Sequence, residues 1–469
     1  MPLSSIAVAT FATAHPVRAA TRAAAIPAIL DTVAVLAAGS GEASVSRLAQ
    51  SLAVSQEAGD RPSFEAGRRH RPDDSALLYG TAAHALDFDD VSMVAICHPS
   101  APVLAALLAV GPWDRLTGPG LCDAHTIGTE VMIRMGQAIG FHHYALGFHS
   151  TATMGVFGAI AALARLRELD TATTANAFAI AASLSSGLRL NFGSMVKPLH
   201  VGIAAANAVR AIEWAQSGVE AGRGDLFDAG GVFHAFSGGV QTEWPDAIKL
   251  GAPFAIDVPG FERKRYPGCY LLHKIIALGL EAARAGIQLA DVAQLRVEMP
   301  RGSTLPLIHP RPSSGSEALF SAPYALLAAL NDGAVGFSTF GDAAVGRAEL
   351  RIRFDDVVVT ETGERILSAE EISAAPVRLD LRLVDGSVRS YARAAAPGSP
   401  SDPMTPSDLR AKWIDCFERI RPDLTAVHVG TLHDAGLAAL SHGPLNDWLE
   451  SIWAVLDAAR APQDGVISK

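Results

Sequence analysis

Polar side chains that could transfer protons stand in four short segments of an otherwise apolar chain. The first segment contains His84 and Asp87, and His98 follows shortly afterwards, directly before a proline. Because Asp87 comes three residues after His84, the two side chains share one face of a predicted helix. A carboxylate beside a histidine can orient and polarise the imidazole for acid/base chemistry. The alternative is that these residues only end and cap helices.

The second and third segments each place polar residues at the start of a predicted helix. His149 precedes a long apolar run, and Lys197 and His200 stand on either side of Pro198. Exposed backbone N–H groups at a helix start favour an anion, so His149 is either a site residue or a neighbour of the N-cap. A lysine among apolar residues is costly to bury, so Lys197 either reaches solvent or serves a site.

The fourth segment is a run of three cations, Arg263, Lys264 and Arg265, followed by Tyr266 and Cys269. In a chain with a net charge of −10, such a run either faces an anionic substrate or forms a solvated surface patch. Nearby cations lower the pKa of a thiol, so we expect Cys269 to be more acidic than an ordinary cysteine.

Composition excludes several classes of function. The 469 residues are 49% hydrophobic and 18% charged, which is enough apolar material for a folded core. The acidic balance argues against nucleic acid or an anionic membrane as a partner. The four cysteines are widely spaced, and the patterns typical of zinc sites and phosphate-binding loops are missing. The longest apolar run, 102–110, is too short to cross a bilayer, so we expect a soluble, cytoplasmic protein.

The elements that must position these residues change in character along the chain. The first half is rich in Ala and Leu at helical spacing, and small residues on the helix faces favour close packing in a buried bundle. The predicted helices of this half are 18–38, 75–87, 101–110, 126–139, 151–166, 173–185 and 201–217.

Alternating apolar residues then predict strands at 294–299, 348–359 and 377–392, with Asp385-Gly386 as a hairpin turn. Helices are predicted at 271–285 and 317–330. Four prolines indicate a linker at 396–406, after which helices at 409–420 and 445–459 resemble those of the first half. We therefore expect a mainly α protein with a large all-helical domain (1–260 with 400–469) and a smaller α+β lid domain (261–399).

Taken together, the four segments resemble the MmgE/PrpD family over nearly the whole chain. A weaker similarity covers 308–333. The motifs that carry the resemblance are HALDFDD…HPS at 84–100, GFHSTATMGVFGAIAALARL at 147–166, GSMVKPLHVGIAAA at 193–206 and KRYPGCYLLH at 264–273.

The resemblance implies a homodimer whose active site lies between the two domains, with no metal and no organic cofactor. It implies a small di- or tricarboxylate substrate and a reaction that passes through a carbanion beside a carboxylate. The motifs supply Asp87, His98, His149, Lys197 and Lys264. With the neighbouring residues, the expected catalytic residues are His149, Lys197, Asp87, His98 and Cys269, and the expected substrate-binding residues are Lys264, His200, Arg265 and Tyr266.

Three positions depart from the family pattern. Val91 stands where the dehydratases and decarboxylases of the family often have threonine, Cys269 where the decarboxylase pattern has histidine, and Leu319 where relatives often have lysine. These departures favour epimerisation of an iminodisuccinate-type substrate, with Cys269 as a second acid/base group. The alternatives are a lyase of the 2-methylcitrate dehydratase or cis-aconitate decarboxylase type, and a non-catalytic binding protein that keeps the fold.

Overall fold

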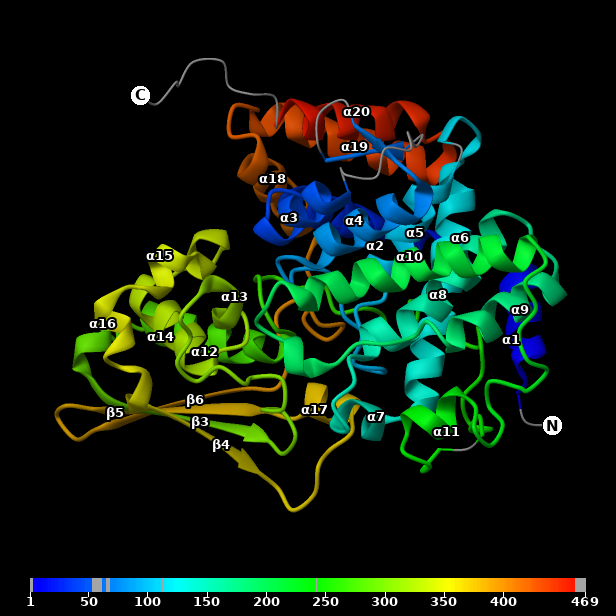
Figure 1. Ribbon diagram of the computed structural model, residues 1–469. Coiled ribbons are helices and arrows are strands. Elements are labelled where there is room, and N and C mark those ends of the chain that lie inside the picture. Colours follow the sequence, from blue (N-terminus) through cyan, green and yellow to red (C-terminus); the bar gives the residue numbers. More distant parts are fainter. Residues whose placement is uncertain (1–2, 53–60, 65–67, 112, 242, 460–469) are drawn as a thin grey trace.

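Most of the described chain is helical, and the predicted fold class, mainly α with a smaller α+β part, is confirmed. The computed structural model describes residues 3–52, 61–64, 68–111, 113–241 and 243–459. Figure 1 shows a large group of helices beside a smaller part that carries a sheet. The larger group contains α1 (Ser5–Ala14), α2 (Ala19–Gly39), α3 (Ala43–Leu52), α4 (Pro72–His84), α5 (Ser100–Val110), α6 (Gly118–Ile139), α7 (Phe141–Ala145), α8 (Ser150–Leu166), α9 (Thr171–Ala182), α10 (Val196–Gln216), α11 (Val232–Phe236), α18 (Pro406–Ile420), α19 (Ala426–His442) and α20 (Asn446–Ala458), with a short pair of strands, β1 (Arg61–Pro62) and β2 (Arg69–His70).

The smaller part is built on a four-stranded sheet in the order β4-β3-β5-β6. Strands β3 and β4 are parallel, and the other two pairings are antiparallel. Figure 1 shows the helices of this part gathered over one face of the sheet. The elements are α12 (His273–Arg284), β3 (Val292–Pro300), α13 (Gly315–Ala318), α14 (Ala322–Asp332), α15 (Asp342–Val345), α16 (Ala348–Arg351), β4 (Val357–Thr362), α17 (Ala369–Ala374), β5 (Val377–Leu383) and β6 (Val388–Arg393). Short 3₁₀ helices are Trp113–Arg115, Arg189–Asn191, Tyr270–Leu272, Leu289–Asp291, Phe337–Phe340 and Phe354–Asp356.

Glycines bring two helices of the large part into backbone contact. A Cβ on Gly80 of α4 would lie 2.8 Å from the Cα of Gly202 on α10, so neither helix tolerates a larger residue at this crossing. The helices run antiparallel here, because His84 at the end of α4 meets Lys197 at the start of α10. The small residues seen in the sequence therefore place two candidate site residues next to each other.

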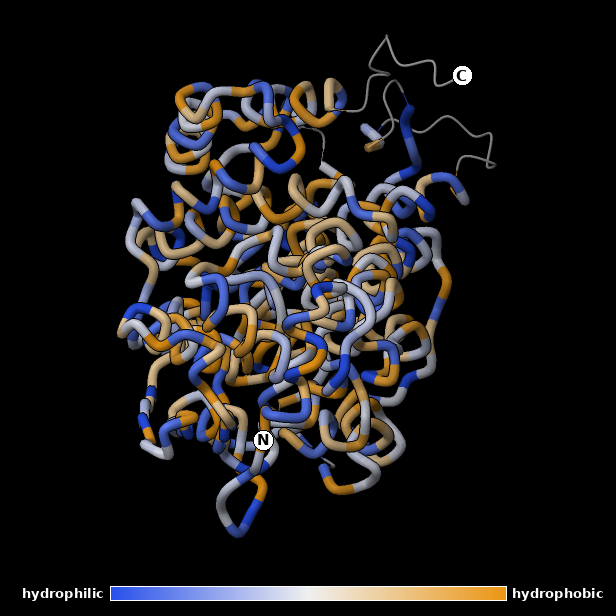
Figure 2. Tube along the Cα trace, turned by 90° about the vertical axis from the view of Figure 1, so that its left-hand side faces the viewer, coloured by the Kyte–Doolittle hydropathy of each residue, from blue (hydrophilic) through white to orange (hydrophobic). Residues whose placement is uncertain are grey.

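Two large hydrophobic cores form inside the molecule, and Figure 2 shows the hydrophobic segments concentrated in its interior. A small third cluster joins the two parts and consists of Val91, Met93, Tyr270, Ala369, Ile372 and Ala396. One large core joins α1–α10 with α18–α20, and the other joins α12 and α14 to the inner face of the sheet. The second core follows the predicted alternation, because Leu295, Val297, Leu379 and Leu381 are fully buried. The division into domains, 1–260 with 400–469 and 261–399, stays a prediction.

One helix is long and apolar enough to cross a membrane by length and composition. This helix, α2, has 21 residues, and Arg22 and Asp31 interrupt its apolar sequence. Of its most apolar 18-residue window, 78% is buried inside the structure, as expected for a helix at the centre of a bundle.

Two sequence predictions in the smaller part are wrong in detail. The predicted strand 348–359 begins with helix α16 and a 3₁₀ turn, and only the β-branched residues from Val357 onwards pair with β3. Its first half alternates polar and apolar residues, but that pattern over four residues also fits one helical turn. The predicted helix 317–330 is divided into α13 and α14, because the Ser321 hydroxyl caps the second helix by accepting from the Tyr324 N–H.

The predicted linker at 396–406 is packed at its start, whereas most of 400–406 is exposed. Residues 396–399 are buried, and the carbonyl of Gly398 accepts a 2.8 Å hydrogen bond from the N–H of Arg263. Gly398 has φ +90°, and a Cβ there would lie 1.8 Å from the Arg263 carbonyl oxygen. The segment therefore supports the strand-like stretch that carries Lys264, and only glycine fits at the contact.

Candidate active site

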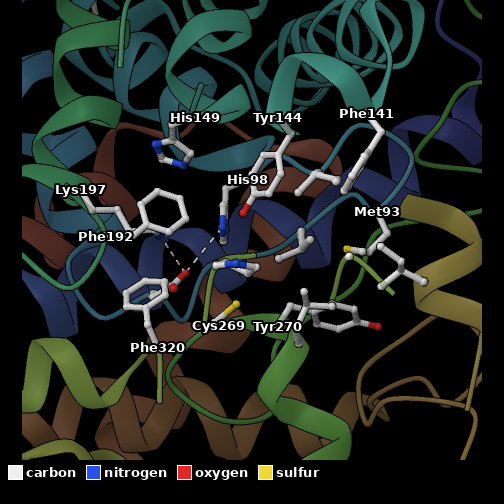
Figure 3. Close-up of a pocket in the computed structure, with 17 residues that line it drawn as sticks. Met93, His98, Phe141, Tyr144, His149, Phe192, Lys197, Cys269, Tyr270 and Phe320 are labelled. Carbon is white, nitrogen blue, oxygen red and sulfur yellow. Dashed lines mark ion pairs between the residues drawn. The ribbon is translucent and has the colours of Figure 1, made fainter. Parts of the chain in front are cut away.

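A small cavity of about 50 Å³ lies between the two parts of the molecule. The helical part supplies Asp87, His98, His149 and Lys197, and the smaller part supplies residues around Cys269 together with Gly302, Phe320 and Ile372. Figure 3 shows Lys197 and His149 on one side of this space, with Phe141 and Met93 on the other. Four of the expected catalytic residues thus meet Cys269 at one cavity.

Asp87 stands directly after α4 in a left-handed backbone conformation, with φ 47°. Such a conformation costs free energy in a residue other than glycine, and is often found where a side chain must be aimed at a site. Lys264 fixes it: its Nζ donates to the carbonyl oxygen of Asp87 at 2.7 Å and to Oδ1 at 2.5 Å. Burial would raise the pKa of Asp87, but the ammonium groups of Lys197 and Lys264 outweigh burial and hold it well below its usual range.

Lys197 is the cation of the cavity, and it is held by two partners. Its Nζ lies 3.3 Å from Asp87 Oδ1 and 2.6 Å from Nε2 of His84. The other ring nitrogen of His84, Nδ1, lies 2.9 Å from the Asp89 carboxylate. Burial lowers the pKa of His84 to about 3, so the ring is neutral, donates from Nδ1 to Asp89 and accepts from Lys197 at Nε2.

His84 and Asp89 were not among the expected site residues. Both are fully buried, and they connect Lys197 to the first motif. The signal was present in the sequence, because His84, Asp87 and Asp89 occur within six residues. The spacing between His84 and Asp89 is not a helical one, however, and the contact forms only because the chain turns sharply at Asp87.

His98 completes the carboxylate cluster from the loop before α5. Its Nε2 lies 3.5 Å from Asp87 Oδ1, and its Nδ1 lies 3.3 Å from Asp89 Oδ2. Its backbone N–H donates to the hydroxyl of Thr151 in the first turn of α8. Burial lowers the pKa of His98, so the ring is neutral near pH 7 and able to accept a proton.

His149 forms the opposite side of the polar end. It is the N-cap residue of α8, and its Nδ1 lies 3.2 Å from Nδ1 of His200, so one ring donates to the other. This contact leaves Nε2 of His149 as the nitrogen that can meet a substrate. Burial, reinforced by the Lys197 charge, lowers the pKa of His149 well below its usual value, and burial lowers that of His200 to about 4.

Cys269 lines the cavity, but its expected acidity is wrong. Burial raises the pKa of its thiol to about 11, and the Asp87 carboxylate adds to this effect. The cations beside it in sequence do not compensate, because the charge of Lys264 is directed at Asp87. The thiol is therefore protonated near pH 7.

Lys264, Arg265 and Tyr266 are directed to three different places. Lys264 reaches Asp87, whereas Arg265 is 43% exposed and pairs with Asp408 at 3.1 Å on the surface. Tyr266 packs against His273, outside the cavity. The structure therefore does not bring Arg265 or Tyr266 to the site. Arg265 points away from Lys264, as successive residues of an extended stretch do, and the chain bends from residue 265 onwards, which turns Tyr266 toward His273.

The two other departures from the family pattern lie at or near the cavity. Val91 lines the cavity beside Met93. Leu319 lies behind Cys269 and accepts the backbone N–H of Cys269 at its carbonyl oxygen, 2.9 Å away. Val91 and Cys269 thus line the cavity, whereas Leu319 contacts the backbone of Cys269 from outside the lining.

The histidine and aspartate cluster could also suggest a metal ion. Ligand atoms of His84, Asp87, Asp89 and His98 lie within 4.8 Å of one another. The ammonium groups of Lys197 and Lys264 already bind the lone pairs that such an ion would need. Two fixed positive charges at the cluster oppose a further cation, so the arrangement favours proton transfer.

Comparisons with known proteins agree with the motifs. Residues 6–245 match the MmgE/PrpD N-terminal domain, and residues 266–427 match the MmgE/PrpD C-terminal domain. The chain is 26% identical to cis-aconitate decarboxylase of Mus musculus over 409 residues, which cover 82% of this chain and 80% of the relative. It is 26% identical to the Homo sapiens protein of the same name over 356 residues, 73% of this chain and 72% of the relative. A shorter match, 29% identical over 151 residues, joins 30% of the chain to 31% of the cis-aconitate decarboxylase-like protein oryM of Aspergillus oryzae.

Proposed function

The chain belongs to the MmgE/PrpD family, and on this basis we propose that it is a cofactor-independent acid/base enzyme of the lyase type. It forms a carbanion beside a carboxylate of a small substrate. The observation that carries the proposal is the cavity in which Lys197, Asp87, His98 and His149 meet. This set supplies a cation for a substrate carboxylate and two neutral histidines for proton transfer.

Each residue has a defined task in this proposal. Lys197 binds the substrate carboxylate and stabilises the negative charge that develops on it in the transition state. His149, fixed by His200, takes up or delivers a proton at Nε2. His98 serves the second proton transfer after it has become protonated, which the negative charge of the bound substrate carboxylate favours. Its imidazolium then protonates a leaving hydroxyl, which departs as water, or the carbanion left after loss of CO₂. Asp87 and Lys264 hold Lys197 and His98 in place.

We prefer a lyase to the epimerase that the three departures from the family pattern (Val91, Cys269 and Leu319) suggest. The relatives described above are named for a decarboxylase, and the protonated thiol of Cys269 is a weak second acid/base group. Epimerisation stays the second candidate, because His98 and His149 both line the cavity and could act on opposite faces of one carbon. A binding protein without activity is disfavoured by the complete network around Asp87.

Proton NMR of the purified protein with cis-aconitate, 2-methylcitrate, citrate and iminodisuccinate stereoisomers tests the proposal. A lyase yields a product with a new vinyl signal or loses CO₂. An epimerase removes an α-proton signal in D₂O while the carbon skeleton stays intact. Epimerisation without elimination or decarboxylation would overturn the lyase assignment and leave the acid/base site standing.

A further inference from the structure

A second cavity lies between helices α2, α18 and α19, which are in the upper part of Figure 1. It shares no lining residue with the candidate active site. Its volume is about 400 Å³, compared with about 50 Å³ for the cavity at Lys197. Pockets that hold small molecules usually measure about 300–1,000 Å³, so the second cavity is large enough for a ligand without any movement of its walls.

Apolar side chains form most of the wall of this second cavity. They come from all three helices and from the segment before α18, and include Ile26, Leu30, Met404, Leu409, Trp413 and Leu437. Trp413 is 1% exposed and lies deep in the structure, whereas Leu437 is 39% exposed and lies at the opening. An alkyl or aryl group that enters between them is removed from water on both sides, which favours binding.

The deep end of the second cavity carries one carboxylate and two cations. Asp31 and Arg263 line it, and Lys412 lies behind Asp31 with its Nζ 2.8 Å from Oδ1. Burial raises the pKa of Asp31, and the charges of Lys412 and Arg263 partly offset this effect, so both cations act on the same carboxylate. Lys412 alone neutralises Asp31, and the charge of Arg263 is left over to attract an anion.

Two polar atoms at this end lack a partner. Asp31 is 6% exposed, and among the described residues neither its Oδ2 nor the buried Nε of Arg263 has a hydrogen-bond partner. Such atoms are costly in a folded protein unless a ligand or water satisfies them. The backbone of Arg263 is fixed, because its N–H donates to the carbonyl oxygen of Gly398 at 2.8 Å. A guanidinium group on a fixed backbone can donate two parallel hydrogen bonds to a carboxylate.

We propose that this second cavity binds an organic anion with one carboxylate, held by Arg263, and an apolar body about the size of a medium-length acyl chain. A cationic head group is disfavoured there, because Asp31 is already paired with Lys412. None of the residues that line the second cavity touches the site of the proposed acid/base chemistry, so the ligand is not the substrate of that site.

Three probes test the head group and the apolar body separately. Decanoate has both, butanoate has the carboxylate with a short chain, and decyltrimethylammonium has the long chain with a cation. Isothermal titration calorimetry on the full chain, below the critical micelle concentrations, should show one decanoate site. Butanoate and decyltrimethylammonium should each bind at least about tenfold more weakly. No decanoate binding, or equal binding of decanoate and decyltrimethylammonium, overturns the proposal.

Variants of Arg263 test the residue that holds the carboxylate. Arg263→Met should weaken decanoate binding at least about tenfold, because a hydrogen-bonded charge is lost. Arg263→Lys keeps the charge and should lie between this variant and the wild type. Undiminished binding by a folded Arg263→Met variant overturns the proposal. If Arg263→Met does not fold, the order of the three probes and the variants of α19 still decide it.

A matched pair on α19 tests the place of binding. Leu437→Trp fills the opening of the cavity and should abolish decanoate binding. Val427→Trp, on the same helix but outside the lining and 78% exposed, should bind decanoate as the wild type does. Lys197→Met should also leave decanoate binding unchanged. Binding that survives Leu437→Trp, or that is lost in Lys197→Met, would place decanoate elsewhere and overturn the proposal.

Discussion

At the scale of single residues, the account depends on which groups carry charge. Asp87 is kept ionised by two ammonium groups, while the histidines around it are kept neutral by burial. Opposite protonation tendencies in one small space are typical of acid/base sites, because the groups then differ in their readiness to give or take a proton.

The catalytic role of the Cys269 thiol distinguishes the two candidate reactions, the lyase and the epimerase. Because burial raises its pKa to about 11, only about one thiol in 10⁴ is ionised at pH 7. We expect Cys269→Ala to keep kcat/KM within about tenfold of the wild type, whereas loss of a general acid or base costs about 10²–10⁴-fold. Steady-state kinetics on the identified substrate, with Cys269→Ser as the conservative comparison, checks this. A loss of 10²-fold or more in both variants would restore Cys269 as an acid/base group and favour the epimerase.

Sequence reasoning located Asp87, His98, His149, Lys197 and Lys264, which the structure brings together, because each stands in a motif. His84 was considered beside Asp87 but was not assigned to the site, and Asp89 was not assigned either, because their contact depends on the left-handed turn at Asp87. Sequence reasoning also placed Arg265 and Tyr266 at the site on the strength of adjacency in sequence. The local backbone conformation decides which side chains of this segment point toward the site, and composition does not determine that conformation.

At the scale of elements, helix α18 reaches the site from the far end of the sequence. The Nζ of Lys412 donates to the carbonyl oxygens of Phe88 at 2.8 Å and Lys264 at 3.0 Å, and lies 2.8 Å from Asp31 Oδ1. It thereby ties the two segments that carry Asp87 and Lys264 to each other and to α2. Lys412 is a candidate positioning residue.

We expect Lys412→Met to lower the free energy of unfolding by about 3–5 kcal/mol, because Asp31 is left buried without its partner. The double variant Asp31→Leu with Lys412→Met should regain much of this stability. Its kcat should stay about 10–100-fold below the wild type, because Lys264 is no longer held. Urea unfolding and steady-state kinetics are the measurements. Wild-type kcat in the stable double variant would show that the lysine has only a structural role.

Glu262 connects the loop of Val91 and Met93, which line the cavity, to the segment that carries Lys264. Protonation of its carboxyl group should make the free energy of unfolding depend on pH. Its backbone pairs with Val91, and its carboxyl accepts the Met93 N–H. Burial raises the pKa of Glu262 to about 8. Between the unfolded value, about 4.3, and pH 8, the folded state holds a proton that the unfolded state has lost, so stability falls as pH rises, by about 1.4 kcal/mol per unit at most.

Glu262→Gln removes this dependence, because the amide stays neutral. The variant should become steadily more stable than the wild type as pH rises from 5 to 8, with little further change above pH 8. Urea unfolding at several pH values measures the difference, and the exposed Glu243→Gln is the control. Parallel stability curves for wild type and Glu262→Gln would show that Glu262 does not titrate in this window.

Helical elements with long periodic patterns were predictable to within a few residues, as α2, α5 and α8 show. Helix α19 was not predicted, and the prediction of α16 as part of a strand is wrong. Short elements are decided by tertiary contacts, since one helical turn and four strand residues share the same pattern of apolar positions. The burial of 396–399, at the start of the predicted linker, likewise depends on a tertiary contact, the hydrogen bond between Arg263 and Gly398.

At the scale of the whole molecule, the site depends on both domains, because Ile372, Phe320 and Cys269 close a cavity whose charged residues lie on the helical part. The family resemblance implies a homodimer. We expect light scattering after gel filtration to give twice the chain mass of 48.9 kDa. A mass equal to one chain would contradict this expectation.

Deuterium incorporation in D₂O tests the central claim most directly, because a carbanion beside a carboxylate takes a deuteron from solvent whenever it is reprotonated. This happens after loss of CO₂, in epimerisation, and on return of the carbanion or reversal of the addition in a dehydratase. The protein is dialysed against EDTA, and mass spectrometry follows cis-aconitate and 2-methylcitrate. We predict deuterium at the carbon next to a carboxylate, in substrate or product, for at least one of the two acids. The rate should fall at least about 10²-fold in Lys197→Met and stay unchanged in the exposed-lysine control Lys249→Ala. Equal rates in wild type and Lys197→Met, incorporation only after a metal is added back, or no incorporation with either acid would contradict the account.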